Sequence, residues 1–233
     1  MKKIIILIFF FSNLCFGQDQ SAYKSGEWLN FKLSYSGWIK AGKASLEIKE
    51  DKLTELYHVK AIGKTTGPIK WFFKVEDYYQ SYFSSETGLP KKFIRKINEG
   101  GYTKDKEILF NHQANLATVK DFKKNTEKSY EIGDDIQDML SALYYLRNQD
   151  FSHLSPNDEI ELKLFFDEET YVFKLLYLGN EVLKTKFGNV NSLIFKPMVQ
   201  SGRVFKEKES VTIWVSADKN KIPLRIKASL VNL

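Results

Sequence analysis

Cysteine, histidine, proline and glycine are all scarce in this sequence of 233 residues, which contains 1 Cys, 3 His, 5 Pro and 13 Gly. A single cysteine excludes a fold held together by disulfide bonds, and so little proline and glycine excludes a collagen-like or low-complexity chain. The charges are interleaved without long blocks of one sign, so neither a nucleic-acid-binding arm nor a polybasic membrane-tethering patch is indicated. The chain instead has 43% hydrophobic and 15% aromatic residues, which suffice for a core without metal or disulfide support.

Residues 1–17 have the organisation of a secretory signal peptide. Two lysines precede an unbroken apolar run from Ile4 to Phe11, which is too short to span a bilayer because spanning takes about 20 residues. An uncleaved membrane anchor is the alternative, and the shortness of the run disfavours it. Cleavage after Gly17 leaves residues 18–233 as a single β-rich domain, which we expect in the periplasm or cell envelope with no transmembrane segment.

Cys15 offers a second interpretation of this leader, in which a lipoprotein signal peptidase cleaves before the cysteine and its sulfur is acylated. The preceding Ser12, Asn13 and Leu14 depart from the lipoprotein pattern, which has a leucine-like residue followed by two small ones. Anchoring through Cys15 is therefore disfavoured. If cleavage follows Gly17, the mature chain has no cysteine, which removes thiol catalysis and thiolate metal sites together.

Apolar residues alternate with polar ones over most of the remaining chain, which is the pattern of half-buried β-strands. Residues 29–35 show it first, and the alternation returns after each turn, with chain reversals expected at 98–101, 167–169 and 178–181. Residues 120–128 are polar and indicate an exposed loop or a strand edge. The pattern predicts a mainly β protein, built as a large curved antiparallel sheet or a partly open β-barrel.

One segment has the spacing of a helix. Its apolar residues recur three and four positions apart, and they are Ile136, Met139, Leu140, Leu143 and Leu146. Asp134 and Asp135 precede them as candidate N-caps, and one helix is predicted over about 135–148. The aromatic residues 71–75 allow either a strand buried on both sides or a short helical turn.

No motif points to a catalytic, cofactor or metal site. The three histidines stand alone, without a second ligand at a metal-binding spacing, and no nucleophile elbow or phosphate-binding glycine loop occurs. We therefore name no catalytic residue, expect no cofactor and expect no enzymatic activity. Asp134 and Asp138 could pair as acid and base on a helix, but capping explains Asp134 and Asp135 more simply.

Arg147 is the candidate buried cation, because it continues an apolar helical stripe that contains Ile136, Leu140 and Leu143. A buried cation needs a partner. One alternative is a structural salt bridge or contacts to carbonyls at the helix C-terminus, and the other is binding of a charged ligand. The sequence favours the structural role.

A single helix cannot cover the whole inner face of a large curved sheet, so the concave face is expected either to fill with core side chains or to surround an apolar cargo. The candidate lining residues are inward positions of the alternating segments. They are Phe31, Leu33, Tyr35, Leu46, Ile48, Tyr57, Leu162, Leu164 and Phe173.

Three segments carry a resemblance to a known family. They are Gly26-Glu27 with 31–35 and the 37–42 turn leading to Ala44, residues 138–147, and 212–216 with Asp218 and 222–224. In that order they are similar to the opening, the helical signature and the closing hairpin of domain-of-unknown-function family 3108, over most of residues 24–230. The resemblance implies an exported bacterial protein with a largely antiparallel β fold and no established activity. The end of the leader, residues 16–18, resembles leaders of Bacteroidetes.

The closing tryptophan strand, turn and proline strand also resemble the end of periplasmic lipoprotein carriers of the Lol type, whose half-open barrel holds acyl chains. This second likeness is an analogy of architecture. It favours a non-enzymatic envelope protein that binds an apolar or amphipathic molecule, such as a lipid or a lipid-linked glycan. One alternative is an assembly or scaffold module that binds another envelope protein through a strand edge or an exposed face. A third is an enzyme acting on polysaccharide, whose two carboxylates would lie about 5 to 9.5 Å apart.

Overall fold

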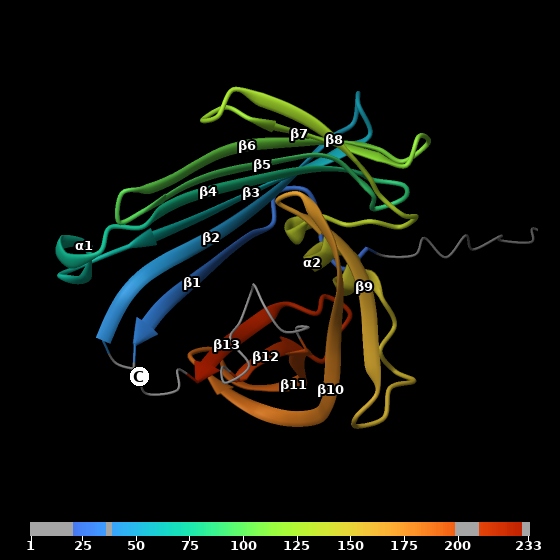
Figure 1. Ribbon diagram of the computed structural model, residues 1–233. Helices are drawn as coiled ribbons and strands as arrows, with labels where there is room; N and C mark the ends of the chain where they lie inside the picture. The colour runs from blue at the N-terminus through green and yellow to red at the C-terminus, as the bar shows by residue number, and fades with distance from the viewer. Residues whose placement is uncertain (1–20, 36–38, 199–209, 230–233) are drawn as a thin grey trace, which may run out of the picture.

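The structure is a computed structural model that describes residues 21–35, 39–198 and 210–229. Over these residues it is mainly β, as the sequence predicts, and its strands form two antiparallel sheets that do not close into a barrel (Figure 1). The large sheet has eight strands in sequence order: β1 (Trp28–Tyr35), β2 (Ile39–Asp51), β3 (Leu56–Thr65), β4 (Glu76–Ser84), β5 (Pro90–Glu99), β6 (Tyr102–Asn111), β7 (Leu116–Asp121) and β8 (Thr126–Glu131). The small sheet has five strands in reverse order: β13 (Pro223–Ser229), β12 (Ser210–Ser216), β11 (Gly188–Met198), β10 (Glu169–Thr185) and β9 (Glu159–Phe166).

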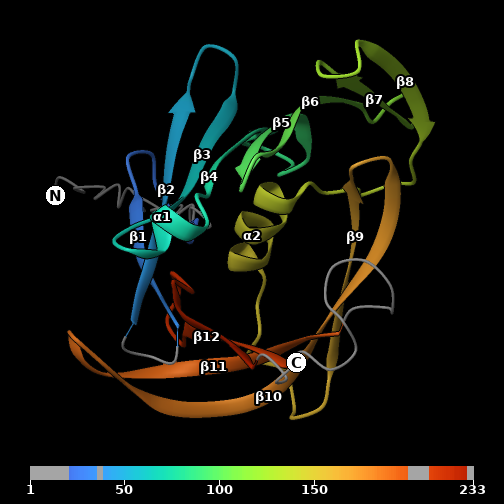
Figure 2. The same cartoon turned by 60° about the vertical axis from the view of Figure 1, so that its left-hand side comes forward.

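Two helices accompany the sheets over the described residues. The longer, α2 (Met139–Asn148), lies between the large and the small sheet in both views (Figures 1 and 2). The shorter, α1 (Ile69–Phe72), forms the end of the β3–β4 hairpin at one extremity of the large sheet (Figure 1). Of the two alternatives for residues 71–75, the short helical turn is correct for 71–72, whereas 73–75 lie beyond the helix and Val75 forms an isolated bridge to Glu99.

Two apolar cores join these layers. The larger core lies on the concave face of the large sheet. There Val59 of β3, Phe93 of β5 and Tyr144 of α2 are almost completely buried. The smaller core lies on the small sheet around Tyr177, and Leu146 of α2 packs against it. Because α2 contributes side chains to both cores, burial of its apolar surface fixes the two sheets relative to each other.

The helix ends at Asn148, as predicted, but begins at Met139, four residues later than the sequence pattern indicated. Its N-cap is Asp138, whose carboxylate accepts hydrogen bonds from the backbone of Leu140 at 2.7 Å and Ser141 at 2.9 Å. The prediction of Asp134 and Asp135 as caps is wrong. Asp135 has a left-handed φ of 58°, which belongs to a turn and not to a helix start.

Other boundaries also differ from the expectation. Residues 178–181 do not reverse the chain, because β10 runs through them and only bulges between Tyr177 and Gly179. A bulge adds one residue and changes the alternation, which explains why the segment resembled a turn in the sequence. Residues 120–128 contain the end of β7, a turn and the start of β8, which matches the strand-edge alternative.

The predicted signal peptide, residues 1–17, and its Cys15 lie outside the described residues. The turn predicted over residues 36–42 is described only from residue 39, and the prediction is wrong there, because Ala41 and Gly42 belong to β2. In the described part of the chain, no helix is long and apolar enough to cross a membrane.

Candidate functional site on the concave face

The concave face of β1, β2 and β3 changes from buried to exposed along the strands. Ile48 and Val59 lie opposite each other in the larger core and are both 0% exposed. Further along the same face, Leu46 and Phe31 are half-buried, and Leu33 is 46% exposed. We call this part of the face the apolar band, and it consists of Phe31 and Leu33 of β1, Ala44 and Leu46 of β2, and Ala61 of β3.

The predicted lining residues are divided between the two sheets, because the chain crosses from one sheet to the other through α2. Five lie on the concave face of the large sheet: Phe31, Leu33, Leu46, Ile48 and Tyr57. Leu162 and Leu164 of β9 and Phe173 of β10 belong to the small sheet instead. Tyr35 ends β1, and its side chain lies outside the description. Ile48 is a core residue, so the partly exposed apolar surface is concentrated at Phe31 and Leu33.

Two glycines border the apolar band and differ in the space around them. A Cβ atom at Gly42 would lie 2.5 Å from the carbonyl oxygen of Lys64 and 3.3 Å from Cδ1 of Leu33. Gly42 therefore permits the close approach of β3. A Cβ atom at Gly63, which pairs with Ala44, would meet no atom within 4 Å. The face has room for a side chain above Gly63.

A group of charged side chains lies further across the same face, and sequence reasoning missed it. We call it the charged clasp, and it joins Arg95, Lys104 and Lys106 of the large sheet to Asp167 and Glu168 of the β9–β10 turn. Asp167 receives hydrogen bonds from Arg95 at 2.7 Å and from Lys104 at 2.8 Å, and Glu168 receives one from Lys106 at 2.9 Å. The available signal was the presence of cations at inward positions of strands that are otherwise apolar inside.

The two carboxylates of the clasp are held in their charged form by these contacts. Burial alone would raise the pKa of Asp167, but the hydrogen bonds and charges of Lys104 and Arg95 outweigh it and keep this pKa below its ordinary value. Hydrogen bonds from Lys106 and from the hydroxyl of Tyr130 lower the pKa of Glu168. Nε of Arg95 is buried and has no acceptor among the described residues.

Asp77 and Glu99 lie beside the clasp and contact each other directly. Burial and the hydrogen bond with Asp77 raise the pKa of Glu99, because two carboxylates in contact favour sharing one proton. Asp77 is itself buried and accepts a hydrogen bond from the backbone of Asn98 at 3.1 Å. The pair is a structural contact between β4 and β5.

Arg147, the candidate buried cation, is 2% exposed and makes four hydrogen bonds to protein groups. Its guanidinium donates to both carboxylate oxygens of Glu27, at 2.6 and 2.8 Å, and to the carbonyl oxygens of Ala22 and Asn220. Bidentate pairing of this kind satisfies the fork geometry of arginine. Four of the five N–H donors of Arg147 are thus used by protein groups, which is the structural alternative for this residue.

Asp138 combines its capping role with complete burial. In addition to the backbone donors, it accepts a hydrogen bond from the hydroxyl of Ser81 on β4 at 2.6 Å. Burial raises the pKa of Asp138 to about 6, although the hydrogen bonds from Ser81 and the backbone oppose this shift. The capping-box spacing between Asp138 and Ser141 was the sequence signal for this helix start.

The histidines do not form a site with one another. His58 contacts the side-chain oxygen of Gln80 at 2.9 Å, His112 contacts the carbonyl oxygen of Pro90 at 2.8 Å, and His153 is exposed. Among the described residues, no group of three or more His, Cys, Asp or Glu side chains could hold a metal ion.

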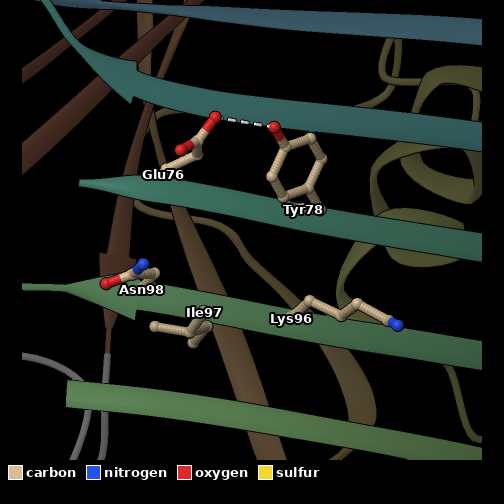
Figure 3. A pocket seen from close by; sticks show the side chains of 5 residues that line it. All are labelled: Glu76, Tyr78, Lys96, Ile97 and Asn98. Atoms are coloured by element: carbon tan, nitrogen blue, oxygen red, sulfur yellow. Dashed lines mark hydrogen bonds between the residues drawn. The ribbon is translucent and has the colours of Figure 1, made fainter. Parts of the chain in front are cut away.

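Two shallow depressions occur away from the apolar band. The first, of about 280 Å³, is lined by Glu76, Tyr78, Lys96, Ile97 and Asn98 (Figure 3). The second, of about 220 Å³, is lined by Asp135, Tyr145, Glu161, Leu162 and Lys163. In the first, the hydroxyl of Tyr78 donates to Glu76 at 2.8 Å, and both alternate with the inward-facing Asp77 (Figure 3). This depression therefore lies on the convex face of the large sheet.

A family model described as "Protein of unknown function (DUF3108)" matches residues 30–232. The chain belongs to the DUF3108 family. The DUF3108 match includes the apolar band, the charged clasp and α2, so all three are parts of the family domain. A search of curated proteins finds no match to the chain.

Solved structures similar to this DUF3108 protein include the following two. A β-barrel-like protein of the DUF1849 family from Brucella abortus matches with a TM-score of 0.57 and 9% identity, over 86% of this chain and 90% of that chain. At this identity the likeness shows the fold alone. A DUF1089 family protein from Pseudomonas aeruginosa matches with a TM-score of 0.44 and 8% identity, over 84% of this chain and 95% of that chain, and we draw nothing from it.

Proposed function

We propose that this DUF3108 protein is a non-enzymatic component of the bacterial cell envelope that binds an amphipathic molecule, such as a lipid or a lipid-linked glycan, along the concave face of the large sheet. The observation that carries the proposal is the exposure gradient on that face. Ile48 is 0% exposed, whereas Leu33, on the same face, is 46% exposed among apolar neighbours. Partly exposed apolar side chains on a concave surface are typical of ligand sites.

The apolar part of such a ligand would lie against Phe31, Leu33 and Leu46. Burial of apolar surface is favourable by roughly 25 cal/mol per Å², or about 0.8 kcal/mol for each methylene group. An acyl chain that buries several methylenes on this band would therefore gain several kcal/mol before the cost of association. The open space above Gly63 leaves room for the chain beside the strand backbone.

The polar part would reach the charged clasp. Leu46 pairs with Ala61, Ala61 with Tyr79, and Tyr79 with Arg95, so three strand spacings separate Leu46 of the apolar band from Arg95. At about 4.8 Å per strand this distance is about 14 Å, which suits an extended amphipathic molecule. The side chains of Arg95 and Lys104 are 15% and 22% exposed, so an anionic head group would meet partly exposed cations at the clasp.

The protein's acid pair supports a binding role over catalysis on polysaccharide. Glycoside hydrolysis requires two carboxyl groups about 5 to 9.5 Å apart across a cleft. Asp77 and Glu99 are instead in hydrogen-bond contact with each other, and Asp77 is buried. Two acids in contact lack the separation that glycoside hydrolysis requires.

The alternative role, binding another protein through a strand edge, is disfavoured at β8. This strand ends the large sheet, and its exposed side chains include Glu127, Lys128 and Glu131. Charged residues of this kind on an edge strand oppose pairing with a further strand.

A pair of substitutions tests the proposal. Gly63→Phe would place a ring in the open space of the apolar band, whereas Lys60→Phe places the same ring on the convex face of the same strand. Each variant is purified from the envelope fraction, its bound lipids are extracted and counted by mass spectrometry, and its thermal unfolding is checked.

We expect lipid with the natural protein and with Lys60→Phe, and at least a five-fold loss with Gly63→Phe. Absence of lipid from the natural protein, or equal lipid in both variants, refutes the proposal. A co-purifying protein without lipid would favour the scaffold alternative.

A further inference from the structure

The end of the β3–β4 hairpin exposes the most concentrated aromatic surface of the described chain. Trp71 and Phe72 are 85% and 89% exposed, and Phe73 is 52% exposed. Tyr102, from the neighbouring β5–β6 hairpin, is 57% exposed. We call these four residues the aromatic tip. A single exposed apolar side chain is common on protein surfaces, but several exposed aromatic side chains next to one another usually mark an interaction site.

The tip is held in place at its base. The backbone of Thr65 donates to the carbonyl of Val75 at 3.1 Å, and the backbone of Val75 donates to the hydroxyl oxygen of Thr65 at 2.9 Å, which closes the loop. Within the loop, the backbone of Phe73 donates to the carbonyl of Ile69 at 2.8 Å. The aromatic side chains are therefore presented on a hydrogen-bonded turn.

The β5–β6 turn supports the tip from the side. The backbone of Gly100 donates to the carbonyl oxygen of Lys74 at 2.8 Å, and the ring of Phe73 lies against Gly100 so closely that a Cβ atom there would be 2.5 Å from the ring. Phe73 thus joins the two hairpin ends. Trp71 and Phe72 project beyond this support and remain available to a partner.

We propose that the aromatic tip docks onto the surface of an anionic lipid bilayer. Tryptophan and phenylalanine side chains insert at the boundary between head groups and acyl chains, and lysines beside them attract lipid phosphates. Lys70 is exposed within α1, and Lys74, also exposed, comes four residues later, after the three aromatic residues. The carboxylate of Glu76 on β4 is shared by Lys64 and Lys74, so this group of one acid and two lysines keeps a net positive charge beside Lys70.

The shape of the tip favours a bilayer over a second copy of the chain. Figure 1 shows α1 at the outermost end of the large sheet, far from the small sheet. A protein partner would need a pocket that matches this projection, whereas a fluid bilayer accepts it without one. The chain has no polybasic run, so aromatic insertion supplies most of the binding and the lysines add a salt-sensitive part.

This inference does not depend on the proposed ligand, because the aromatic tip shares no residue with the apolar band or the charged clasp. Loss of lipid binding at the band would leave docking unchanged, and the reverse also holds. The two proposals therefore fail separately.

Co-sedimentation with vesicles tests the docking. The protein, purified as the cell exports it, is mixed with vesicles of phosphatidylcholine and phosphatidylglycerol at 3:1, and with phosphatidylcholine alone. The test variant is Trp71→Ser with Phe72→Ser. The matched control is Trp28→Ser with Phe187→Ser, which removes one exposed tryptophan at the start of β1 and one exposed phenylalanine in the β10–β11 turn of the small sheet.

We expect the natural protein and the control to bind the anionic vesicles and to bind less at high salt. The tip variant should bind at least ten-fold more weakly while unfolding at the same temperature, because the removed rings are exposed. Equal vesicle binding by the tip variant and the natural protein overturns the proposal, and so does absence of binding by the natural protein. If the natural protein does not bind vesicles and is a dimer, while the tip variant is a monomer, the role of the tip is self-association.

Discussion

Arg147, in the last turn of α2, holds the carboxylate of Glu27, a residue 120 positions earlier, in a bidentate pair with distances of 2.6 and 2.8 Å. The same guanidinium donates to the carbonyl of Asn220 in the β12–β13 turn. One cation therefore ties together the N-terminal segment before β1, the central helix and the end of the small sheet. On α2 this arginine lies next to Leu146, which packs against the smaller core, and three residues after Tyr144 of the larger core.

Glu27→Ala should destabilise the protein by about 3 kcal/mol. The substitution leaves the guanidinium of Arg147 almost fully buried without its anion, and breaking a buried pair costs about 3 to 5 kcal/mol. We take the lower end because the side chain of Glu27 is 18% exposed. Urea denaturation measures the difference as a change in the unfolding midpoint.

Two further variants control this prediction. Glu47→Ala removes an exposed salt bridge with Lys49 and should leave the unfolding midpoint unchanged. Glu27→Leu combined with Arg147→Met replaces the buried pair by apolar groups and should recover most of the lost stability. If Glu27→Ala unfolds at the urea concentration of the natural protein, the pair does not stabilise the fold.

The features that could be predicted from the sequence are those that depend on residues close together in the chain. Alternation in residues 29–35 and helical spacing up to Leu146 both correspond to observed elements, and the capped helix ends at Asn148 as expected. Alternation tells which face of a strand is buried, but not which sheet the strand joins. Leu162 and Phe173 were therefore assigned to one lining with Phe31, although they belong to the small sheet.

The parts that could not be predicted depend on contacts between distant segments. Arg147 had no identifiable partner in the sequence, because Glu27 comes near it only when the N-terminal segment crosses the end of α2. The charged clasp is of the same kind, since Asp167 reaches Arg95 only when the β9–β10 hairpin packs on the large sheet. Such pairs are set by tertiary packing and leave no periodic signal.

Asp138→Asn should remove a pH-dependent loss of stability between about pH 4 and 6. Burial raises the pKa of Asp138 from 3.8 to about 6, so the unfolded chain releases this proton at lower pH than the folded protein. The stabilisation from the protonated group is complete below the unfolded pKa and is lost as the pH rises through the folded pKa. A difference of this size corresponds to about 3 kcal/mol.

The measurement is the free energy of unfolding of both proteins from pH 3.5 to 7. Asparagine keeps the N-cap, so the difference between the natural protein and the variant isolates the titration of Asp138. As the pH rises, the free energy of unfolding of the natural protein should fall relative to that of Asp138→Asn. A difference that stays constant over this range would show that Asp138 does not titrate there.

Asp167→Asn should loosen the contact between the two sheets. Arg95 and Lys104 lose their shared anion, and because all three side chains are partly exposed, we expect a loss of only about 1 kcal/mol at neutral pH. The pKa of Asp167 is lowered in the folded state, so its contribution is present above the unfolded pKa and disappears as the pH falls. Hydrogen exchange of β9 and β10 should become faster near their turn.

Glu159→Gln provides the comparison, because Glu159 pairs with Lys174 on the same two strands but is more exposed and contacts no part of the large sheet. It should leave exchange near the turn unchanged. Equal protection in Asp167→Asn and the natural protein would mean that apolar packing alone holds the hairpin in place.

Two single variants, Gly100→Ala and Gly101→Ala, when compared with each other, measure how strongly the β5–β6 turn supports the aromatic tip. Both glycines have left-handed φ values, 56° and 96°, so an alanine at either position has a backbone cost of about 1 kcal/mol or more. At Gly101 a Cβ atom meets nothing within 4 Å, whereas at Gly100 it meets the ring of Phe73 at 2.5 Å. Gly100→Ala should therefore be the more destabilising by about 1 to 2 kcal/mol, because it also displaces Phe73.

The same pair of variants links the fold to the tip's proposed role. If the ring of Phe73 holds Trp71 and Phe72 in position, its displacement in Gly100→Ala should weaken vesicle binding, while Gly101→Ala should bind as the natural protein does. Thermal unfolding gives the stability difference, and co-sedimentation gives the binding difference on the same samples. Equal stability of the two variants would show that Phe73 moves aside without cost, and the tip would then owe its position to the Thr65–Val75 hydrogen bonds alone.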